Sequence, residues 1–266
     1  MGLFKRNGPS IWLFSILAAL FVAGCADDLP KAGQIGAANA ETVVYSFDVR
    51  ITENATDATE NGSVSGYALT VGYGLADREA RTIHYAANTT IDNGDHETRT
   101  EAATYLFGKW VYTDLFGQWV KVPAEEGLFG MMDHVGQIAA ELKGSDEMPS
   151  RATLDGEPCL VLDIDPGSDR ASLAFADDEA RRLKQAGADI DAMLEDFVYR
   201  IWVDEKTLKL KRKRVMTRVV MTADNNPLVA GIVERTIVVD VRFHPGPEGP
   251  LLLPENISSA PELGRM

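Results

Sequence analysis

The side chains best suited to chemistry are two cysteines, Cys25 and Cys159, and four histidines, His84, His96, His134 and His244. A metal site usually needs such ligands at recurring spacings such as HxxxH, HxH or CxxC, and none of these patterns occurs. A GxSxG nucleophile motif and a phosphate-binding glycine loop are also absent from the sequence. Carboxylates are abundant, but no motif singles out a pair of them for acid–base catalysis. We therefore expect that the chain is not an enzyme and needs no metal ion and no cofactor.

Cys25 is the residue whose surroundings predict a reaction at its own side chain. A basic segment with Lys5 and Arg6 is followed by an uncharged apolar run, residues 11–24, that ends in small residues. This order is typical of a secretory signal, and the run is shorter than the roughly 18 residues of a membrane span. The sequence VAGC resembles the prokaryotic lipobox, in which the cysteine thiol receives a diacylglycerol and begins the mature protein. A retained signal anchor, or an ordinary signal cleaved elsewhere, is the alternative.

The lipobox interpretation predicts a domain plan and a location. We expect a signal peptide over 1–24, a flexible tether over 25–40 and a single domain over 41–266. Two acyl chains on Cys25 would anchor the protein stably to a membrane, at the cell surface or in the periplasm. The formal net charge of −14 repels phosphates, which excludes nucleic acid as a partner. With Cys25 modified, Cys159 has no disulfide partner, and its apolar neighbours predict a buried thiol.

The predicted domain consists of about six strands, a helix, two strands, a helix and three strands. Residues 44–51 alternate between polar and apolar side chains, which is typical of a half-buried strand. A turn signal at 92–95 predicts a tight hairpin, and one at 224–227 predicts a turn that joins the last two strands into a long hairpin. Apolar residues at helical spacing predict one helix over 128–142 and a second helical region over 177–197, broken near Gly187. The fold class is therefore α+β, a large curved antiparallel sheet with two helical segments covering its apolar face.

Three segments are similar to a known superfamily. The stretches YLFGKWVYTDLFGQWVKVP (105–123), YRIWVDEKTLKLKRKRV (199–215) and LLLPENISSAPEL (251–263) resemble segments of prokaryotic LolA/LppX-like lipoproteins. The basic run KLKRKR departs from that pattern, which usually has a proline and fewer charges there. The resemblance implies a half-open barrel of about 11 strands whose concave side is closed by helices over an apolar cavity. It also implies that no bond is made or broken during function.

The resemblance and the methionine-rich helix together predict a protein that binds or carries a lipid or another hydrophobic ligand. The alternative is an envelope interaction or sensor domain with the same fold and a filled core. Inward-pointing small residues such as Ala68, Ala86 and Ala103 would leave room for the ligand. The candidate cavity residues are Phe47, Tyr67, Leu69, Met131, Met132, Val135, Met193 and Phe197.

The basic run at 209–214 has two interpretations. Alternation along a strand would place Lys209, Lys211 and Lys213 on one outward face, because Leu208 and Leu210 share the opposite parity and should point toward apolar cover. A solvated strand face is one interpretation. Contact with anionic lipid head groups is the other, since each basic residue near a membrane contributes about 1 kcal/mol.

Overall fold

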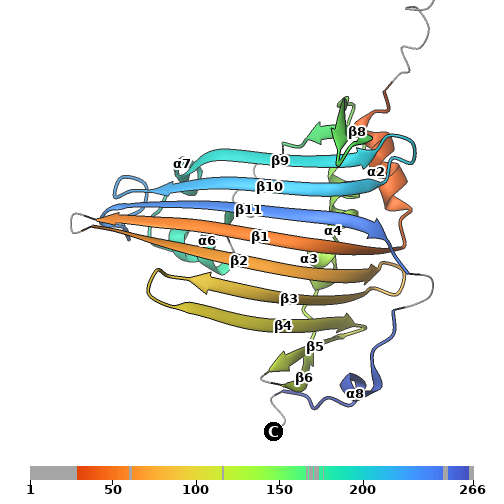
Figure 1. Ribbon diagram of the computed structural model, residues 1–266, viewed down its shortest axis with the longest axis horizontal. Helices are drawn as coiled ribbons and strands as arrows, with labels where there is room; N and C mark the ends of the chain where they lie inside the picture. Colours follow the sequence, from red (N-terminus) through yellow and green to blue (C-terminus); the bar gives the residue numbers. More distant parts are fainter. Residues whose placement is uncertain are drawn as a thin grey trace, which may run out of the picture. The chain divides into compact units, whose positions relative to one another are not determined.

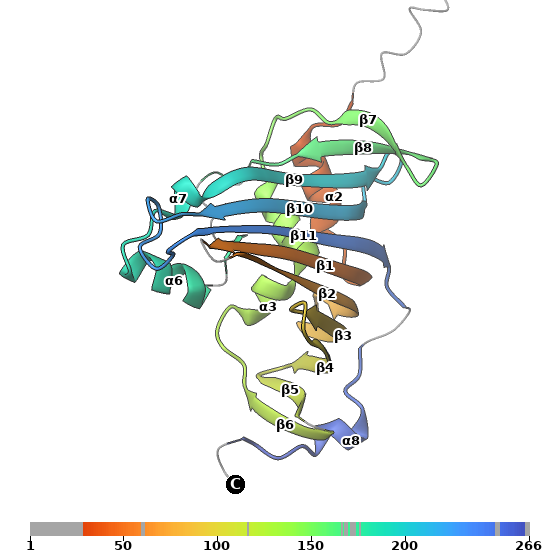
Figure 2. The same cartoon turned by 60° about the vertical axis from the view of Figure 1, so that its left-hand side comes forward.

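Eleven strands form one sheet in the order β6-β5-β4-β3-β2-β1-β11-β10-β9-β8-β7, with every neighbouring pair antiparallel. The strands are β1 Val44–Thr59, β2 Gly62–Asp77, β3 Thr82–Asp92, β4 Glu97–Phe107, β5 Trp110–Leu115, β6 Gln118–Pro123, β7 Ser150–Leu154, β8 Glu157–Asp163, β9 Leu194–Asp204, β10 Leu210–Met221 and β11 Ile232–Pro245. The sheet does not close, because β6 and β7 are its two edges (Figures 1 and 2). Together with short helices it makes a curved half-barrel, and the predicted α+β class is confirmed.

The computed structural model describes residues 29–59, 62–115, 117–165, 167, 170, 174–175, 177–247 and 251–263. Residues 31–266 make up one compact unit, to which the sheet belongs. Cys25 and the predicted signal peptide lie outside the described residues. In the described part of the chain, no helix combines the length and the apolar character needed to cross a membrane.

Tight turns explain why successive strands pair in sequence order. Between β3 and β4, Gly94 has a φ of 84° and its N–H donates to Asp92 Oδ1 at 2.8 Å. Between β5 and β6, Gly117 has a φ of 83° and donates to Asp114 Oδ1 at 2.7 Å. These positive φ values favour glycine, and the aspartates satisfy the turn backbone. The sheet therefore contains long runs of adjacent hairpins.

The helices are α2 Ala32–Ala40, α3 Leu128–Met132, α4 His134–Glu141, α6 Asp177–Gln185, α7 Ile190–Met193 and α8 Glu255–Ser258. Contacts place α4 and α6 on the same side of the sheet. Tyr45 Oη donates to Asp133, the N-cap residue of α4, at 3.1 Å, and Arg235 pairs with Glu179 of α6 at 2.9 Å. Tyr45 and Arg235 point to one side because the β1–β11 register pairs Ala55 with Arg235 and Tyr45 with Pro245. We call this side the helix face and the opposite side the outer face.

Two helical covers lie on the helix face, at opposite ends of the long strands (Figures 1 and 2). The first cover consists of α3 and α4, and the second of α6 and α7. The order of strands and helices along the chain agrees with the sequence prediction. Cys159 is fully buried, as predicted.

The predicted continuous helix over 128–142 is wrong at Asp133. This residue has φ −81° and ψ 79°, which ends α3, and its carboxylate caps α4 by accepting from Gly136 N at 2.9 Å. The same carboxylate pairs with Arg78 at 2.8 Å and accepts from Tyr45. Tertiary partners on the sheet therefore favour two short helices over one long helix.

The predicted second helical region is correct in its break and wrong in its end. Gly187 has a φ of 84° and separates α6 from α7. Leu194 and Phe197, predicted as part of the helix, belong to β9. The strand begins there because β9 pairs with β10 from Leu194 onward.

The predicted flexible tether over 25–40 is wrong for its last nine residues, which form α2. Ile35 is fully buried, and Asn39 binds the β9–β10 turn through Leu208 O at 2.8 Å and Leu210 N at 3.0 Å. A Cβ at Gly36 would lie 3.0 Å from Leu142, so the glycine allows the helix to approach the end of α4. The folded domain therefore begins before residue 41.

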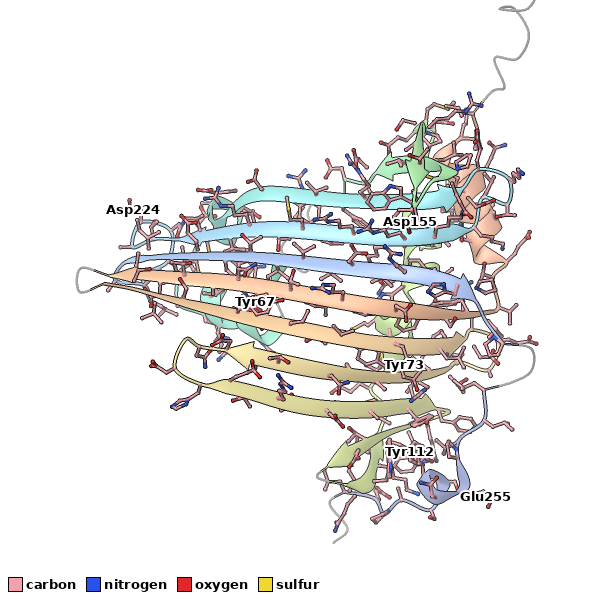
Figure 3. All side chains as sticks on the ribbon, viewed as in Figure 1. Tyr67, Tyr73, Tyr112, Asp155, Asp224 and Glu255 are labelled. Carbon is pink, nitrogen blue, oxygen red and sulfur yellow. The ribbon has the colours of Figure 1, made fainter. Side chains whose placement is uncertain are left out.

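The C-terminal segment covers the outer face of β5 and β6. Ile257 of α8 and Ala260 pack with Tyr112, and the half-buried rings of Tyr105, Trp110 and Trp119 surround them. Lys121 N donates to Pro261 O at 2.9 Å, which adds a short parallel bridge to edge strand β6. Figure 3 labels Tyr112 and Glu255 at this end of the sheet.

Candidate functional site

The eight predicted cavity residues fall into three groups. Phe47 and Phe197 lie on the helix face of the sheet, and Val135 and Met193 are buried in the two covers. Met131 is 54% exposed on α3, and Met132 is half-buried there. The structure does not bring all eight together, because Tyr67 and Leu69 lie on the outer face.

The register decides the position of Tyr67 and Leu69. The helix-face residue Glu53 pairs with Ala68, so the neighbours of Ala68 in β2 point the other way. Figure 3 labels Tyr67 and Tyr73, two residues of this parity. The helix face of β2 instead carries Ala68, Thr70, Gly72 and Gly74. Of the three small residues expected to point inward, only Ala68 does; Ala86 and Ala103 lie on the outer face.

Small residues on β2 make room for aromatic rings beneath the first cover. A Cβ at Gly74 would lie 2.1 Å from the ring of Phe47, so only glycine permits this ring position. Phe47 stacks on Tyr85 with centroids 6.4 Å apart and meets the His134 ring edge-on at 5.3 Å. Aromatic side chains therefore fill the part of the space beneath α4 that lies over β1–β3.

Hydrogen bonds and ion pairs hold the first cover to the sheet. Asp133 binds both Tyr45 and Arg78, while Tyr199 Oη donates to Glu141 Oε2 at 2.6 Å. Burial, with the neighbouring carboxylate, raises the pKa of each tyrosine, Tyr45 beside Asp133 and Tyr199 beside Glu141. Both phenols therefore remain protonated donors at any ordinary pH. These bonds tie α4 to β1, to β9 and to the turn after β2.

Lys213 lies beneath this cover, contrary to the prediction that it points outward. Its side chain is on the helix face, where β10 pairs Lys213 with Val241 and Ile201, and the residue is only 6% exposed. The Lys213 ammonium lies 5.1 Å from the centre of the Tyr199 ring. Burial lowers the pKa of Lys213, and the charge of Glu141 partly opposes that shift.

A β-bulge is the reason for the wrong orientation. The β9–β10 register shifts between Leu210 and Arg212, so Lys211 is an extra residue and the alternation changes parity across it. Leu210 before the bulge and Lys213 after it are both buried. No turn residue in KLKRKR marks this insertion in the sequence.

The other two lysines of the run have partners within the protein. Lys209 donates to Ala38 O at 2.5 Å and to Thr42 Oγ1 at 2.9 Å, which ties it to the end of α2. Lys211 pairs with Glu157 at 2.5 Å and with Asp204 at 3.3 Å. Contact of these lysines with lipid head groups stays an untested prediction.

His134 begins α4 and faces the same buried region. Its Nδ1 is enclosed and has no hydrogen-bond partner among the described residues. Burial and the charge of nearby Lys213 lower the pKa of His134 to about 4, which the carboxylate of Asp133 only partly offsets. The imidazole is therefore neutral at physiological pH.

Apolar packing holds the second cover. Leu183 of α6 and Ile190 and Met193 of α7 form a buried cluster with Phe175 and Val219. An ion-pair group accompanies them, in which Arg235 bridges Glu53 at 2.6 Å and Glu179 at 2.9 Å. The second cover therefore depends mainly on nondirectional contacts.

Between the two covers lies a stretch of helix face that is only half-buried. It contains Ile51 of β1, Val239 and Ile237 of β11 and Phe197 of β9, all of intermediate exposure. We call these four residues the apolar strip. Lys213 is next to one end of the strip, since its partner Val241 is two residues from Val239. Arg235 is at the other end, two residues from Ile237.

The outer face carries a separate groove of about 440 Å³ across β1–β5. Its floor is built of small residues, including Gly72, Ala86 and Ala103, and the exposed side chains of Val71 and Tyr73 border it. Asp48, Glu101 and Asp114 place carboxylates around it. No group of three or more His, Cys, Asp or Glu residues suited to a metal ion occurs in the described parts of the chain.

Comparison with known proteins gives structural similarities only. No family model matches the sequence, and no curated protein matches it. The crystal structure of LprF from Mycobacterium bovis is similar over 85% of this chain and 96% of its own, at 14% identity and a TM-score of 0.41. The crystal structure of the LolA superfamily protein NE2245 from Nitrosomonas europaea is similar over 86% of this chain and 97% of its own, at 12% identity and a TM-score of 0.24.

Proposed function

We propose that the protein binds a hydrophobic ligand, such as a lipid acyl chain, on the helix face of the sheet between the two helical covers. The observation that supports this proposal is the half-buried apolar strip of Ile51, Val239, Ile237 and Phe197. These side chains lie on the helix face between the two covers. A bound hydrocarbon chain would bury them further, and each Å² of apolar surface removed from water contributes about 25 cal/mol of binding free energy. On β2, the short side chain of Thr70 lies beside Ile51 on the same face.

In the proposed function the protein binds and releases the ligand, and no covalent bond is made or broken. Helix α3 of the first cover is the proposed moving part. No residue of α3 is buried, and α3 ends at the cap residue Asp133, which α4 shares. Movement of α3 would widen access to the helix face without breaking the bonds of α4 to the sheet.

Anchoring to a membrane belongs to the same proposal and rests on the VAGC sequence before the domain. Lipidation of Cys25 would place the domain outside the cytoplasm, on a membrane surface where acyl chains are available. A Cys25→Ser protein should lose the lipid mass and leave the membrane fraction on cell fractionation. An unchanged mature mass and continued membrane association would exclude lipidation at Cys25.

A pair of adjacent substitutions tests ligand binding. Val239→Trp would fill the strip on the helix face, whereas Val238→Trp places the same ring on the outer face, because neighbouring residues of β11 point to opposite sides. Uptake of a fluorescent fatty acid by the detergent-free Cys25→Ser protein should fall about tenfold for the first variant and remain unchanged for the second. Native mass spectrometry of the same preparation should detect a bound lipid. Equal uptake by both variants would place binding elsewhere.

A second candidate function is an interaction module with a filled core. Two observations favour it: the aromatic rings that fill the space beneath α4, and the exposed Val71 and Tyr73 at the outer groove. A protein that takes up no fatty acid and carries no lipid, but loses partner binding on Tyr73→Ala, would support this function instead.

A further inference from the structure

Lys213 has an unusual environment for a lysine. The residue is 6% exposed, and its ammonium has no hydrogen bond or ion pair with any described residue. Its contacts are the face of the Tyr199 ring and the longer-range charge of Glu141. An ammonium group in a largely buried position is stabilised by hydrogen-bond acceptors, and no described residue supplies one to Lys213.

Glu141 does not fill that role. Its Oε2 accepts the hydrogen bond of Tyr199 Oη at 2.6 Å, and the residue is exposed on the last turn of α4. Among the described residues no ion pair joins Lys213 to Glu141, which acts on the ammonium only through its charge. The carboxylate therefore moderates the charge of Lys213 without binding it.

His134 provides a second unpartnered group at the same place. Its Nδ1 is enclosed without a hydrogen-bond partner, and the charge of Lys213 acts directly on the ring. A neutral imidazole can donate one hydrogen bond from either ring nitrogen. Lys213 and His134 therefore offer two donors beneath α4 that the protein itself leaves unused.

These donors lie at the end of the apolar strip. Val239, the nearest residue of the strip on β11, is two residues from the register partner of Lys213. Arg235, at the opposite end, is already neutralised by Glu53 and Glu179. The helix face thus presents an unpaired cation at one end only, followed by apolar side chains.

We infer that Lys213, with His134 beside it, binds the anionic head group of a single-chain amphiphile whose hydrocarbon chain lies on the apolar strip. This inference rests on the proposed function and specifies its ligand class. A carboxylate or phosphate oxygen would supply the missing acceptor for the ammonium, in a charge-assisted hydrogen bond. An uncharged alcohol would give the Lys213 ammonium and the His134 ring weaker hydrogen bonds than an anionic head group gives them.

Three probes with the same chain test the inference: dodecanoate, dodecyl phosphate and dodecanol. Binding to the detergent-free Cys25→Ser protein is measured at pH 7.5 by calorimetry. We expect at least one anionic probe to bind about tenfold or more tightly than dodecanol, since hydrogen bonds to charged groups contribute that much. The two anionic arms separate a carboxylate head from a phosphate head.

Variants of Lys213 connect the preference to the side chain. Lys213→Met should bring the anionic probe and dodecanol within about twofold of each other, while dodecanol binding persists, because the apolar strip is unchanged. Lys213→Arg should keep the preference. Lys211→Met is the matched control, since Lys211 is two residues away and already pairs with Glu157 and Asp204. A Lys213→Met/Glu141→Gln protein removes both charges together and replaces the single variant if that variant unfolds.

The outcomes separate this inference from the proposed function. If the protein with Lys213 binds all three probes equally, Lys213 does not bind the head group. The same holds if the preference for an anionic probe over dodecanol survives Lys213→Met. Either result leaves the proposed hydrophobic binding intact. Failure of all three probes to bind overturns the proposed function itself.

Discussion

Beneath α4, charged and aromatic side chains join the cover to the sheet through the Arg78–Asp133–Tyr45 bonds and the Tyr199–Glu141 bond. Beneath α6 and α7, the contact is a cluster of Leu183, Ile190, Met193 and Val219. Both covers lie on one face of one sheet, so their difference does not come from the face that they cover. It comes from the residues of the covers and from Lys213, which β10 turns inward at the first cover. One cover is therefore directional and sensitive to charge, whereas the other depends on apolar area.

The largest expected effect is at the centre of the directional cover. Asp133→Ala removes the cap of α4 and leaves Arg78, whose side chain is 21% exposed, without its carboxylate. Loss of one partner of such a pair costs about 3–5 kcal/mol of unfolding free energy, which urea denaturation measures. Asp133→Asn keeps an acceptor for Gly136 and Tyr45 and should cost less. A loss below about 1 kcal/mol for Asp133→Ala would show that this cover, too, depends on apolar contacts.

The apolar cover should respond to truncation instead of charge. Met193 is fully buried, and Met193→Ala should cost about 2–5 kcal/mol through lost contacts and the cavity that remains. That loss should be the same at pH 5 and pH 8, because no titrating group of the cluster changes. A pH-dependent loss would contradict the distinction between the two covers.

Acid should weaken the directional cover selectively. The pKa of His134 is about 4 in the folded protein and 6.5 ordinarily, so between these values the unfolded chain binds a proton that the folded protein excludes. The stability from the neutral imidazole is therefore present above pH 6.5 and is lost as the pH falls toward 4. At 1.4 kcal/mol for each pKa unit, the loss amounts to at most about 3.5 kcal/mol.

The charges that face His134 are Lys213 from β10 and Asp133 from its own cap. His134→Gln should flatten the dependence of unfolding free energy on pH between 4 and 6.5. His84→Gln is the matched control on the outer face, where burial also lowers the pKa of the histidine but Tyr105 stacks on the ring. If His84→Gln flattened the profile more than His134→Gln, the acid-sensitive group would lie outside the first cover.

The sequence was sufficient for the strands, their turns and their order. The signals are local: polar and apolar residues alternate in β1, and turn residues occur at 92–95 and 224–227. They predict the antiparallel sheet that the structure contains. The break at Gly187 is also local, because a positive φ favours glycine. Phe47, Val135 and Met193 could be placed on the helix side for the same reason, since they belong to apolar strand parities or helix faces, whereas Phe197 was predicted in a helix and lies on β9.

Three features depended on contacts between distant residues. Tyr67 and Leu69 are the large residues of β2, and large residues usually face a core. They lie on the outer face instead, because the helix face of β2 carries small residues such as Gly74, above which the ring of Phe47 packs. Asp133 ends a helix of good periodicity because Arg78 and Tyr45 bind its carboxylate.

Lys213 is the clearest case. A single extra residue at Lys211 reverses the alternation of β10, and a strand with period two sends every later side chain to the opposite face. The sequence KLKRKR by itself determined a charged strand. Only the pairing of that strand with β9 and β11 decided that one of its lysines is buried under α4, because the register of a sheet is set by its neighbours.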